Sequence, residues 1–396
     1  MHYLVISDSF TPKINSGSII VGDLVNEMLR LGNKVTVITF QEELTKLYNI
    51  EEVNNLRIIR IKVGDRSKSR FHRALIEMTY SSKIISIFKE NNFIDLDRVI
   101  CYSPSIFFGK AVKWIKNTHR VPAYLVIRDI FPKWALDARL LKKGLIYYYF
   151  KYVEKTLYDS VDFLGIESKS DLEYFHGIVS KHNKKIEVLN NWSASIDSTR
   201  IKASSSFINE HKINIVYGGN VSEAQDLLAL VKILDRDLFM ENMIHLTIMG
   251  EGQQLLSIDK YIKKNNLHHI SLYPAQDRYT YLSFLSKSDI GLISLNKKLL
   301  SHNYPLKMLG YMQLGKPIIA SVNDGNEILD FFKRNKVGLA SVAGDNSALN
   351  DNIKEISLNH NMRSEYGTNA ISTFENEFTV ESIMKKIESS FMEINN

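Results

Sequence analysis

The pattern of apolar and polar positions alternates between short β-like runs and helical periodicity from the first residues onward. Residues 3–7 form an apolar run, a polar loop follows over 8–18, and apolar residues then recur at helical spacing over 19–30. A β-branched run at 34–40 comes after Gly32 and Asn33, a pair typical of a helix C-terminus. This order predicts a βαβ unit with a right-handed crossover.

The same alternation continues and then restarts in the second half of the chain. Further strand-like runs lie at 57–63, 98–102, 123–128 and 163–166, and a second series lies at 213–217, 244–249, 270–273, 290–293, 318–320 and 338–341. Each series opens with a strand, and alternating strands and helices favour a parallel sheet covered on both faces. We therefore predict an α/β protein with two Rossmann-like domains facing a central cleft.

The boundary between these domains is predicted near the middle of the chain. Residues 193–206 are polar and follow the segment Leu189-Asn190-Asn191-Trp192. We assign residues 1–190 to an N-terminal domain and residues 191–379 to a C-terminal domain. Residues 380–396 form a separate C-terminal helical segment.

Composition limits where such a protein works. The chain has 396 residues, which suits two domains, and its single cysteine, Cys101, allows no internal disulfide. The first residues carry neither a basic flank nor a cleavage site, so we expect no secretion signal. No apolar run approaches the roughly 20 residues that a spanning helix needs. These features together favour a cytoplasmic protein.

Charge is distributed unevenly between the two halves. Residues 1–190 hold 29 Lys and Arg against 21 Asp and Glu, whereas the remainder holds 21 against 23. A basic first half suggests a polyanionic neighbour, such as an anionic membrane, a nucleic acid or a phosphate substrate, although solubility alone is the simpler explanation. We find no RNA- or DNA-binding motif, so we expect no nucleic acid partner.

The most informative motif spans residues 304–320. It places Pro305, Leu306 and Lys307 at the start of a short helix, and a Gly-Lys-Pro turn and an apolar run follow. A helix N-terminus with a nearby lysine is an anion site, because its unpaired N–H groups and its dipole favour negative charge. The segment resembles the donor-phosphate region of glycosyltransferase family 4, whose common form is P-S-K-x-x-E-Y-M-A-x-G-K-P. Gly310 stands where that family has a glutamate.

Other segments carry the same resemblance. Tyr217-Gly218-Gly219-Asn220 is similar to the turn that opens the second domain, with a helix expected from about residue 223 to 234. Gly250-Glu251-Gly252 matches G-[DE]-G after a strand. The resemblance implies donor-binding roles for Gly17, Ser18, Gly219, Asn220, Gly250, Gly252, Pro274, His302, Pro305, Leu306, Lys307 and Tyr311.

The catalytic prediction rests on Arg128, Asp129 and Lys307. The segment Arg128-Asp129-Ile130-Phe131-Pro132 resembles the R-D-x-[WF]-P form of a subgroup that builds bacterial surface polysaccharides. Asp129 can orient an acceptor hydroxyl or act as its base, and Arg128 can meet a phosphate. An internal Arg–Asp pair that closes the loop is the alternative. Lys307 is expected to hold the departing diphosphate.

The resemblance implies a GT-B fold and a retaining, metal-independent transferase without a cofactor. It also implies that residues 1–190 bind the acceptor and that residues 191–379 bind the nucleotide sugar. The expected donor is a nucleotide sugar, and the expected acceptor is a polyprenyl-diphosphate-linked glycan for O-antigen or capsule. The expected location is the inner face of the cytoplasmic membrane, an anionic surface. Residues 142–155 interleave lysines with aromatic residues, which suits lipid headgroups, although a core-packed helix fits as well. In relatives the C-terminal helix crosses back to the first domain.

Two alternatives remain open at this point. The family's glutamate pair corresponds to His302 and Gly310, and neither residue is acidic. This substitution favours a catalytically inactive, membrane-associated partner of another glycosyltransferase. A sugar-nucleotide 2-epimerase is the other alternative, but it needs carboxylates around the sugar.

Overall fold

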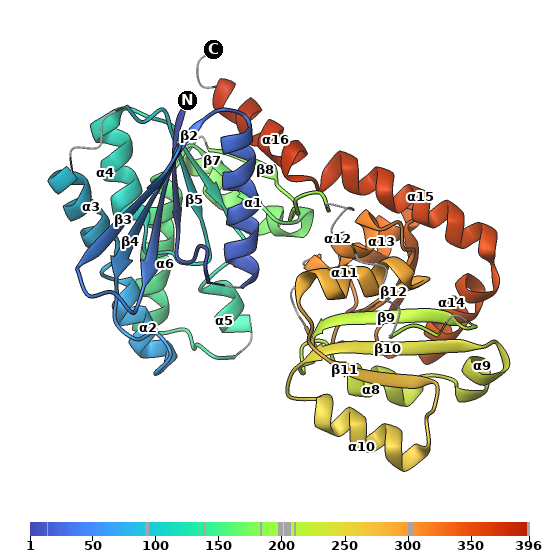
Figure 1. Ribbon diagram of the computed structural model, residues 1–396. Coiled ribbons are helices and arrows are strands. Elements are labelled where there is room, and N and C mark those ends of the chain that lie inside the picture. The colour runs from blue at the N-terminus through green and yellow to red at the C-terminus, as the bar shows by residue number, and fades with distance from the viewer. Residues whose placement is uncertain are drawn as a thin grey trace. The chain divides into compact units, whose positions relative to one another are not determined.

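The computed structural model describes residues 1–13, 15–91, 95–137, 139–182, 184–196, 201, 207–209, 211–299 and 304–393. The chain divides into two compact units: unit 1 holds Met1–Ala194 and Val380–Asn396, and unit 2 holds Ser195–Thr379 (Figure 1). The sequence places these boundaries after residues 190 and 379. None of the helices within the described ranges is long and apolar enough to cross a membrane.

Unit 1 is built on an eight-stranded sheet with the order β3-β4-β2-β1-β5-β6-β7-β8. Neighbouring strands are parallel, except that β3 runs antiparallel to β4 at the edge. The strands are β1 (His2–Ser7), β2 (Lys34–Gln41), β3 (Tyr48–Val53), β4 (Leu56–Lys62), β5 (Arg98–Tyr102), β6 (Ala123–Val126), β7 (Phe163–Ile166) and β8 (Lys185–Val188). Sequence analysis missed β3 and β8, which lie at the two edges and lack an apolar run.

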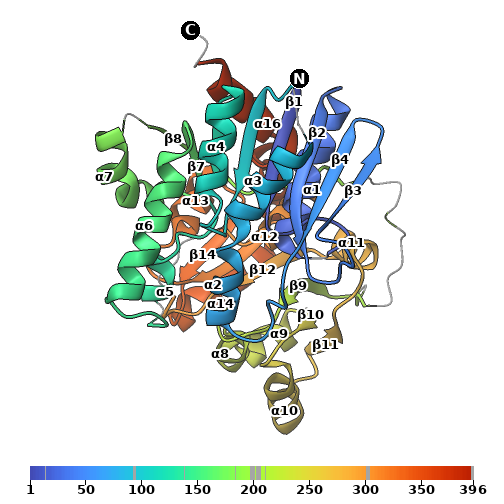
Figure 2. The same cartoon turned by 90° about the vertical axis from the view of Figure 1, so that its left-hand side faces the viewer.

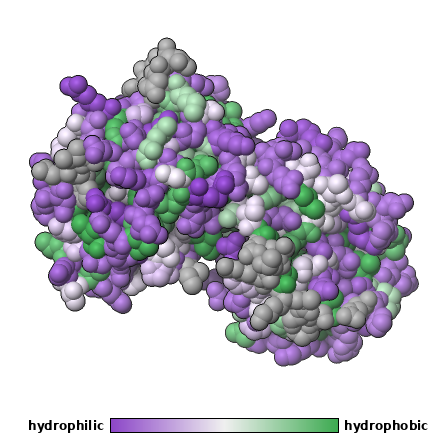
Figure 3. Space-filling view, turned by 45° about the horizontal axis from the view of Figure 1, so that its top comes forward, coloured by the Kyte–Doolittle hydropathy of each residue, from purple (hydrophilic) through white to green (hydrophobic). Residues whose placement is uncertain are grey.

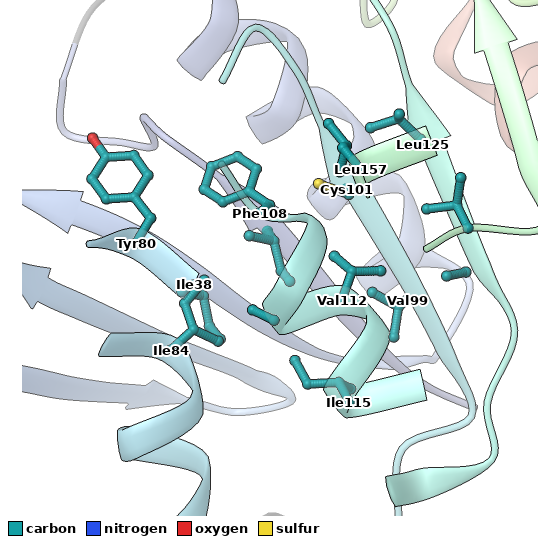
Figure 4. Close-up of a cluster of buried hydrophobic side chains, with 14 of the residues drawn as sticks. Ile38, Tyr80, Ile84, Val99, Cys101, Phe108, Val112, Ile115, Leu125 and Leu157 are labelled. Carbon is teal, nitrogen blue, oxygen red and sulfur yellow. The ribbon is translucent and has the colours of Figure 1, made fainter. Parts of the chain in front are cut away.

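Helices cover both faces of this sheet. They are α1 (Ser16–Arg30), α2 (Arg70–Glu77), α3 (Tyr80–Asn91), α4 (Gly109–His119), α5 (Lys133–Asp137), α6 (Leu145–Asp159), α7 (Leu172–His182) and α16 (Val380–Met392), with a 3₁₀ turn η1 (Lys169–Asp171). Figure 2 shows α3, α4 and α6 in front of the sheet. The core beneath them combines strand residues such as Val99 and Leu125 with Ile84 and Val112 from the helices (Figure 4).

Helix α16 packs against the opposite face of unit 1. Arg98 of β5 forms an ion pair with Glu388 and donates a hydrogen bond to the Tyr3 hydroxyl at 2.9 Å. The Phe391 ring lies 6.1 Å from that of Tyr124. The last helix therefore belongs to the same compact unit as the first strand, although 290 residues separate Arg98 from Glu388.

Unit 2 is built on a six-stranded parallel sheet with the order β11-β10-β9-β12-β13-β14. The strands are β9 (Ile213–Asn220), β10 (Ile244–Glu251), β11 (Ile270–Pro274), β12 (Ile290–Ser294), β13 (Ile318–Val322) and β14 (Gly338–Val342). The helices are α8 (Leu227–Ile233), α9 (Arg236–Glu241), α10 (Leu255–Asn265), α11 (Arg278–Lys287), α12 (Leu306–Gln313), α13 (Glu327–Asn335), α14 (Asn346–Leu358) and α15 (His360–Glu377). Separate apolar clusters pack on the two faces of the sheet.

Strand β9 differs from the sequence prediction at its end. We expected a turn at 218–220, but the strand continues to Asn220, and Gly219 pairs with Gly250 of β10. A Cβ atom at Gly250 would lie only 1.9 Å from the carbonyl oxygen of Gly219, so glycine permits this pairing. Helix α8 also begins at Leu227 rather than 223, because Asp226 at its N-cap is left-handed, with φ 47°.

We predict that Gly250→Ala destabilises unit 2, because its methyl group would displace the β9 backbone. Overpacking of this kind costs about 1–3 kcal/mol, and backbone atoms cannot rotate away as a side chain can. Differential scanning calorimetry should show a lower melting temperature than for the unmodified chain. Gly22→Ala in α1 is the control: nothing lies within 4 Å of the added carbon, so its melting temperature should stay level or rise. Equal melting temperatures for the two variants would contradict the tight pairing.

Candidate active site

The strongest candidate for ligand binding in unit 2 is the start of helix α12. Pro305 is the N-cap residue, and its side chain makes no capping hydrogen bond to the helix. The preceding residue, Tyr304, is buried, and its ring lies 5.2 Å from that of Phe331. This anchor fixes the position at which the helix begins. The first turn therefore presents backbone amides and the positive end of the helix dipole.

Lys307 follows within this first turn and reaches over the end of β9. Its ammonium nitrogen lies 3.5 Å from the centre of the Tyr217 ring, a cation–π contact. Gly219 lies beside the same nitrogen, because a Cβ atom at this position would be in van der Waals contact with it, at 3.8 Å. The Tyr217 hydroxyl is held by the Asn220 carbonyl at 2.5 Å, so the ring is fixed beneath the lysine.

The charge of Lys307 is not matched within the described part of the chain. No described carboxylate forms an ion pair with it, and no described acceptor forms a hydrogen bond with its ammonium. Burial lowers its pKa to about 7, and no neighbouring anion raises it. An anionic ligand would supply the missing partner and favour the protonated form. This is the electrostatic property expected of a diphosphate site.

Three of the predicted glycines surround this lysine or support its surroundings. Gly219 adopts φ +116° and lies beside Lys307. Gly250 of β10 pairs with Gly219 in the sheet. Gly252 adopts φ +147°, and a Cβ atom there would lie 2.3 Å from the Val221 carbonyl oxygen. Side chains are thus excluded from the adjoining ends of β9 and β10, which leaves backbone groups within reach of a ligand.

Other predicted donor-binding residues occupy different positions. Tyr311 is fully buried, and its hydroxyl accepts a hydrogen bond from the Gly218 amide at 3.3 Å and donates one to the Leu292 carbonyl at 3.1 Å. It supports the end of β9 from within the core, and its predicted donor-binding role stays a prediction. The Pro274 carbonyl, at the end of β11, accepts a hydrogen bond from the side-chain amide of Gln276 at 3.2 Å.

The remaining predicted positions in unit 2 add less. Leu306 is half-buried in the first turn of α12, and Asn220 is exposed beside Ser222. His302 lies outside the described residues. Within the described residues no group of three or more His, Cys, Asp and Glu could hold a metal ion. Metal independence remains an expectation.

In unit 1 the predicted loop residues Gly17 and Ser18 belong to the first turn of α1. The Asn15 side chain accepts from the Ser18 amide at 2.8 Å, and the Ser18 hydroxyl accepts from the Asn15 amide at 3.0 Å. This reciprocal capping box uses the Ser18 hydroxyl for the helix itself. Gly17 faces Tyr102, whose ring would lie 3.7 Å from an added Cβ atom.

Arg128 is held mainly by its own chain. Its guanidinium donates to the carbonyls of Leu189 and Asn190, at 2.7 and 3.1 Å, and lies 4.8 Å from the centre of the Trp192 ring. Its Nε atom is buried without a partner in the described residues. Arg128 therefore fixes the segment after β8, near the end of unit 1. The predicted phosphate contact stays a prediction.

Two carboxyl groups lie near this guanidinium. Asp129 is exposed. Desolvation raises its pKa, and the nearby Arg128 guanidinium opposes this shift. Water screens the interaction with Arg128, because the carboxylate is exposed. Glu167 is buried, accepts a hydrogen bond from the Asn191 amide, and has its pKa raised by burial to about 8 although Arg128 opposes the shift. Glu167 is therefore mainly protonated at neutral pH, whereas Asp129 is the group open to a ligand.

Sequence reasoning missed three residues that shape these sites: Tyr217, Trp192 and Glu167. Tyr217 is an aromatic residue directly before paired glycines, but the sequence does not show that its ring is buried beneath Lys307. Trp192 lies in the segment that we assigned to the domain boundary. The sequence shows that this residue is aromatic but not that its ring contacts Arg128. Nothing in the sequence marks Glu167 as a buried acid, because burial depends on distant parts of the chain.

Comparison with known families bears on unit 2 first. Residues 198–373 match the sequence profile of the family described as Glycosyl transferases group 1. We call this matched region the group 1 domain. This match confirms the predicted enzyme class, and it includes the glycine-lined strand ends, Lys307 and helix α12. No curated protein is significantly similar to the chain in sequence.

Solved structures confirm the predicted fold class across both units. A sucrose-phosphate synthase from Thermosynechococcus elongatus is 15% identical with a TM-score of 0.71, covering 99% of this chain and 98% of its own. A UDP-forming α,α-trehalose-phosphate synthase from Burkholderia xenovorans is 10% identical with a TM-score of 0.70, covering 100% and 99%. WaaG, a glycosyltransferase involved in lipopolysaccharide biosynthesis, is 12% identical with a TM-score of 0.63, covering 97% and 98%. At these identities the likeness concerns the GT-B fold alone.

We predict that a nucleoside diphosphate binds the group 1 domain with an affinity that falls as pH rises above 7. Below that pH the free lysine already carries its proton, whereas above it binding must take up a proton, because the ligand raises the lowered pKa. Affinity should fall by up to about tenfold per pH unit between pH 7.5 and 9, where the diphosphate is already ionised. Isothermal titration calorimetry in buffers of different ionisation enthalpy measures both affinity and proton uptake.

Lys307→Met supplies the matched control for that titration. It should bind the same nucleoside diphosphate weakly, with no pH slope in this window and no proton uptake. A pH-independent affinity in the unmodified protein would contradict the role of Lys307.

Proposed function

We propose that the protein is a retaining glycosyltransferase that transfers a sugar from a nucleotide-diphosphate donor to a lipid-linked glycan acceptor. The observation that carries this proposal is the half-buried Lys307, whose charge no described residue matches, at the uncapped start of α12. A desolvated cation without a protein partner costs free energy in the empty site. Binding of the donor diphosphate recovers that cost.

The same arrangement suits the chemical step. As the bond between sugar and diphosphate breaks, negative charge develops on the diphosphate oxygens. Lys307 and the amides of the first turn of α12 are fixed before the reaction, so they stabilise this charge without reorganising. A lysine suits the task because its ammonium acts as a compact point charge. In this proposal Asp129 orients the acceptor hydroxyl or removes its proton.

The acceptor is proposed to be a polyprenyl-diphosphate-linked glycan for bacterial O-antigen or capsule. Support comes from the basic residues 1–190 and from the R-D-x-[WF]-P form at Arg128, which resembles surface-polysaccharide transferases. Such an acceptor is embedded in an anionic leaflet, so we place the protein at the inner face of the cytoplasmic membrane. The structural similarity to WaaG, a glycosyltransferase involved in lipopolysaccharide biosynthesis, is compatible with this location.

A catalytically inactive partner of another glycosyltransferase is the second candidate. It is favoured by Gly310, which occupies the place of a family glutamate implied to lie near the donor ribose. A Cβ atom at Gly310 would meet only one Leu285 methyl carbon, at 3.8 Å, among its surroundings. A Cβ atom therefore fits at this position without a clash.

We predict that Lys307→Ala abolishes donor-dependent sugar transfer while the protein remains folded. The reason is that removing a desolvated charge does not disturb the apolar packing of α12 on the sheet. A thermal-shift panel of UDP, GDP, ADP and TDP sugars first identifies the donor through ligand-induced stabilisation. Transfer and donor hydrolysis are then measured with that donor. Full turnover by Lys307→Ala would remove this lysine from the mechanism.

We predict that Gly310→Glu strengthens donor binding severalfold, because it restores a carboxylate beside the proposed ribose site. Gly310→Ala is the matched control, since both variants gain helix propensity of up to about 1 kcal/mol but only one gains a carboxylate. Calorimetric titration with the nucleoside diphosphate distinguishes them. Equal affinities in the two variants would contradict a ribose site at this position.

A further inference from the structure

Helix α6 of unit 1 is apolar on two opposite faces. Its inner face includes Phe150 and Val153, which pack against the core of unit 1, and the buried Leu157. Its outer face carries large apolar and aromatic residues at positions i, i+3, i+4 and i+7, the spacing of one helical stripe. The exposed fractions of this outer stripe are 91% for Leu145, 62% for Tyr148, 41% for Tyr149 and 63% for Tyr152.

Two further apolar residues on or near α6 are also exposed. Ile146 is 55% exposed, and Trp134 of α5 is 43% exposed. The Trp134 ring lies 6.1 Å from that of Phe131, which in turn lies 4.9 Å from Phe150 of α6, so α5 is packed against this helix. Figure 3 shows one face of the molecule, on which hydrophobic residues lie among hydrophilic ones. An exposed apolar stripe such as that of α6 marks an interaction site.

The charges around the outer stripe identify its partner. Residues 138–153 contain four basic and no acidic residues. Lys142 and Lys143 are both exposed and directly precede the start of α6 at Leu145. A second copy of this chain, docked face to face, would bring like charges together. Anionic headgroups above an apolar layer instead match both the lysines and the stripe.

We propose that the outer stripe of α6, with Ile146 and Trp134, docks into the headgroup layer of an anionic lipid bilayer. The inference rests on the proposed function in one respect, since a lipid-linked acceptor requires the enzyme to work at such a surface. Tyrosine and tryptophan suit this layer because one part of each side chain is apolar and another donates a hydrogen bond. Leu145 and Ile146 enter furthest, and Lys142 and Lys143 contact lipid phosphates.

Vesicle sedimentation of the full chain tests the surface without any nucleotide. With vesicles of equal parts phosphatidylglycerol and phosphatidylcholine, we expect binding that is much weaker with phosphatidylcholine alone. Leu145→Ser combined with Tyr148→Ser and Tyr152→Ser should lower the partition coefficient at least about tenfold. The matched control replaces three apolar residues of unit 2 that are each at least half exposed, Met240, Leu256 and Leu358, with serine and should bind normally.

The lysines are tested separately. Lys142→Gln with Lys143→Gln should weaken binding to the anionic vesicles by about fivefold per lysine at low salt. Lys263→Gln with Lys264→Gln, on the exposed face of α10, is the control pair and should have no comparable effect. If both pairs of substitutions weakened vesicle binding equally, general charge attraction would explain the binding. That result would overturn the proposed surface.

Trp134 reports where the protein meets the lipid. Brominated lipids should quench its fluorescence, and Trp134→Phe should remove that quenching, because Trp192 is buried and Trp114 is half-buried against the core of unit 1. Sedimentation equilibrium without vesicles should give the same mass for the unmodified chain and the stripe variant. A dimer that the stripe variant abolishes would assign the surface to a second copy instead. Nucleotide binding should be unchanged in the stripe variant, so failure here is distinguishable from failure of the proposed activity.

Discussion

The account depends on one electrostatic constraint, the Lys307 ammonium held above the Tyr217 ring without a described carboxylate beside it. A protein interior rarely keeps a desolvated cation unless something outside the chain completes it. In this structure the pKa near 7 expresses the incomplete state, because burial disfavours the charge and no partner restores it. Binding of a diphosphate would recover the most free energy at such a site.

The rest of unit 2 supports this arrangement rather than adding further charge. Glycines at the ends of β9 and β10 let two backbones approach where side chains would collide, and Tyr311 secures the end of β9 from within the core. Unit 1 follows a different principle. Arg128 donates hydrogen bonds to backbone carbonyls of its own chain, while Asp129 remains exposed. In this loop the cation therefore has a structural role, and the neighbouring carboxylate is accessible to a ligand.

Hydrophobic periodicity predicted the α/β class and most central strands, since buried parallel strands require continuous apolar runs. It did not predict β3 or β8, whose edge positions tolerate polar residues. The site was predictable where a motif has a local mechanism, as for Lys307 at a helix start. It was not predictable where the environment comes from distant residues: the burial of Tyr311, the carbonyls that bind Arg128 and the raised pKa of Glu167 all depend on tertiary packing.

The most direct test is to measure the pKa of Lys307 itself. Reductive methylation with ¹³C-formaldehyde labels the lysines, and the Lys307→Arg spectrum assigns the resonance of interest. The account predicts a titration near pH 7 in the free protein and a clear upward shift when a nucleoside diphosphate is added. A pKa at the ordinary lysine value of about 10.4 with and without the nucleotide would contradict it.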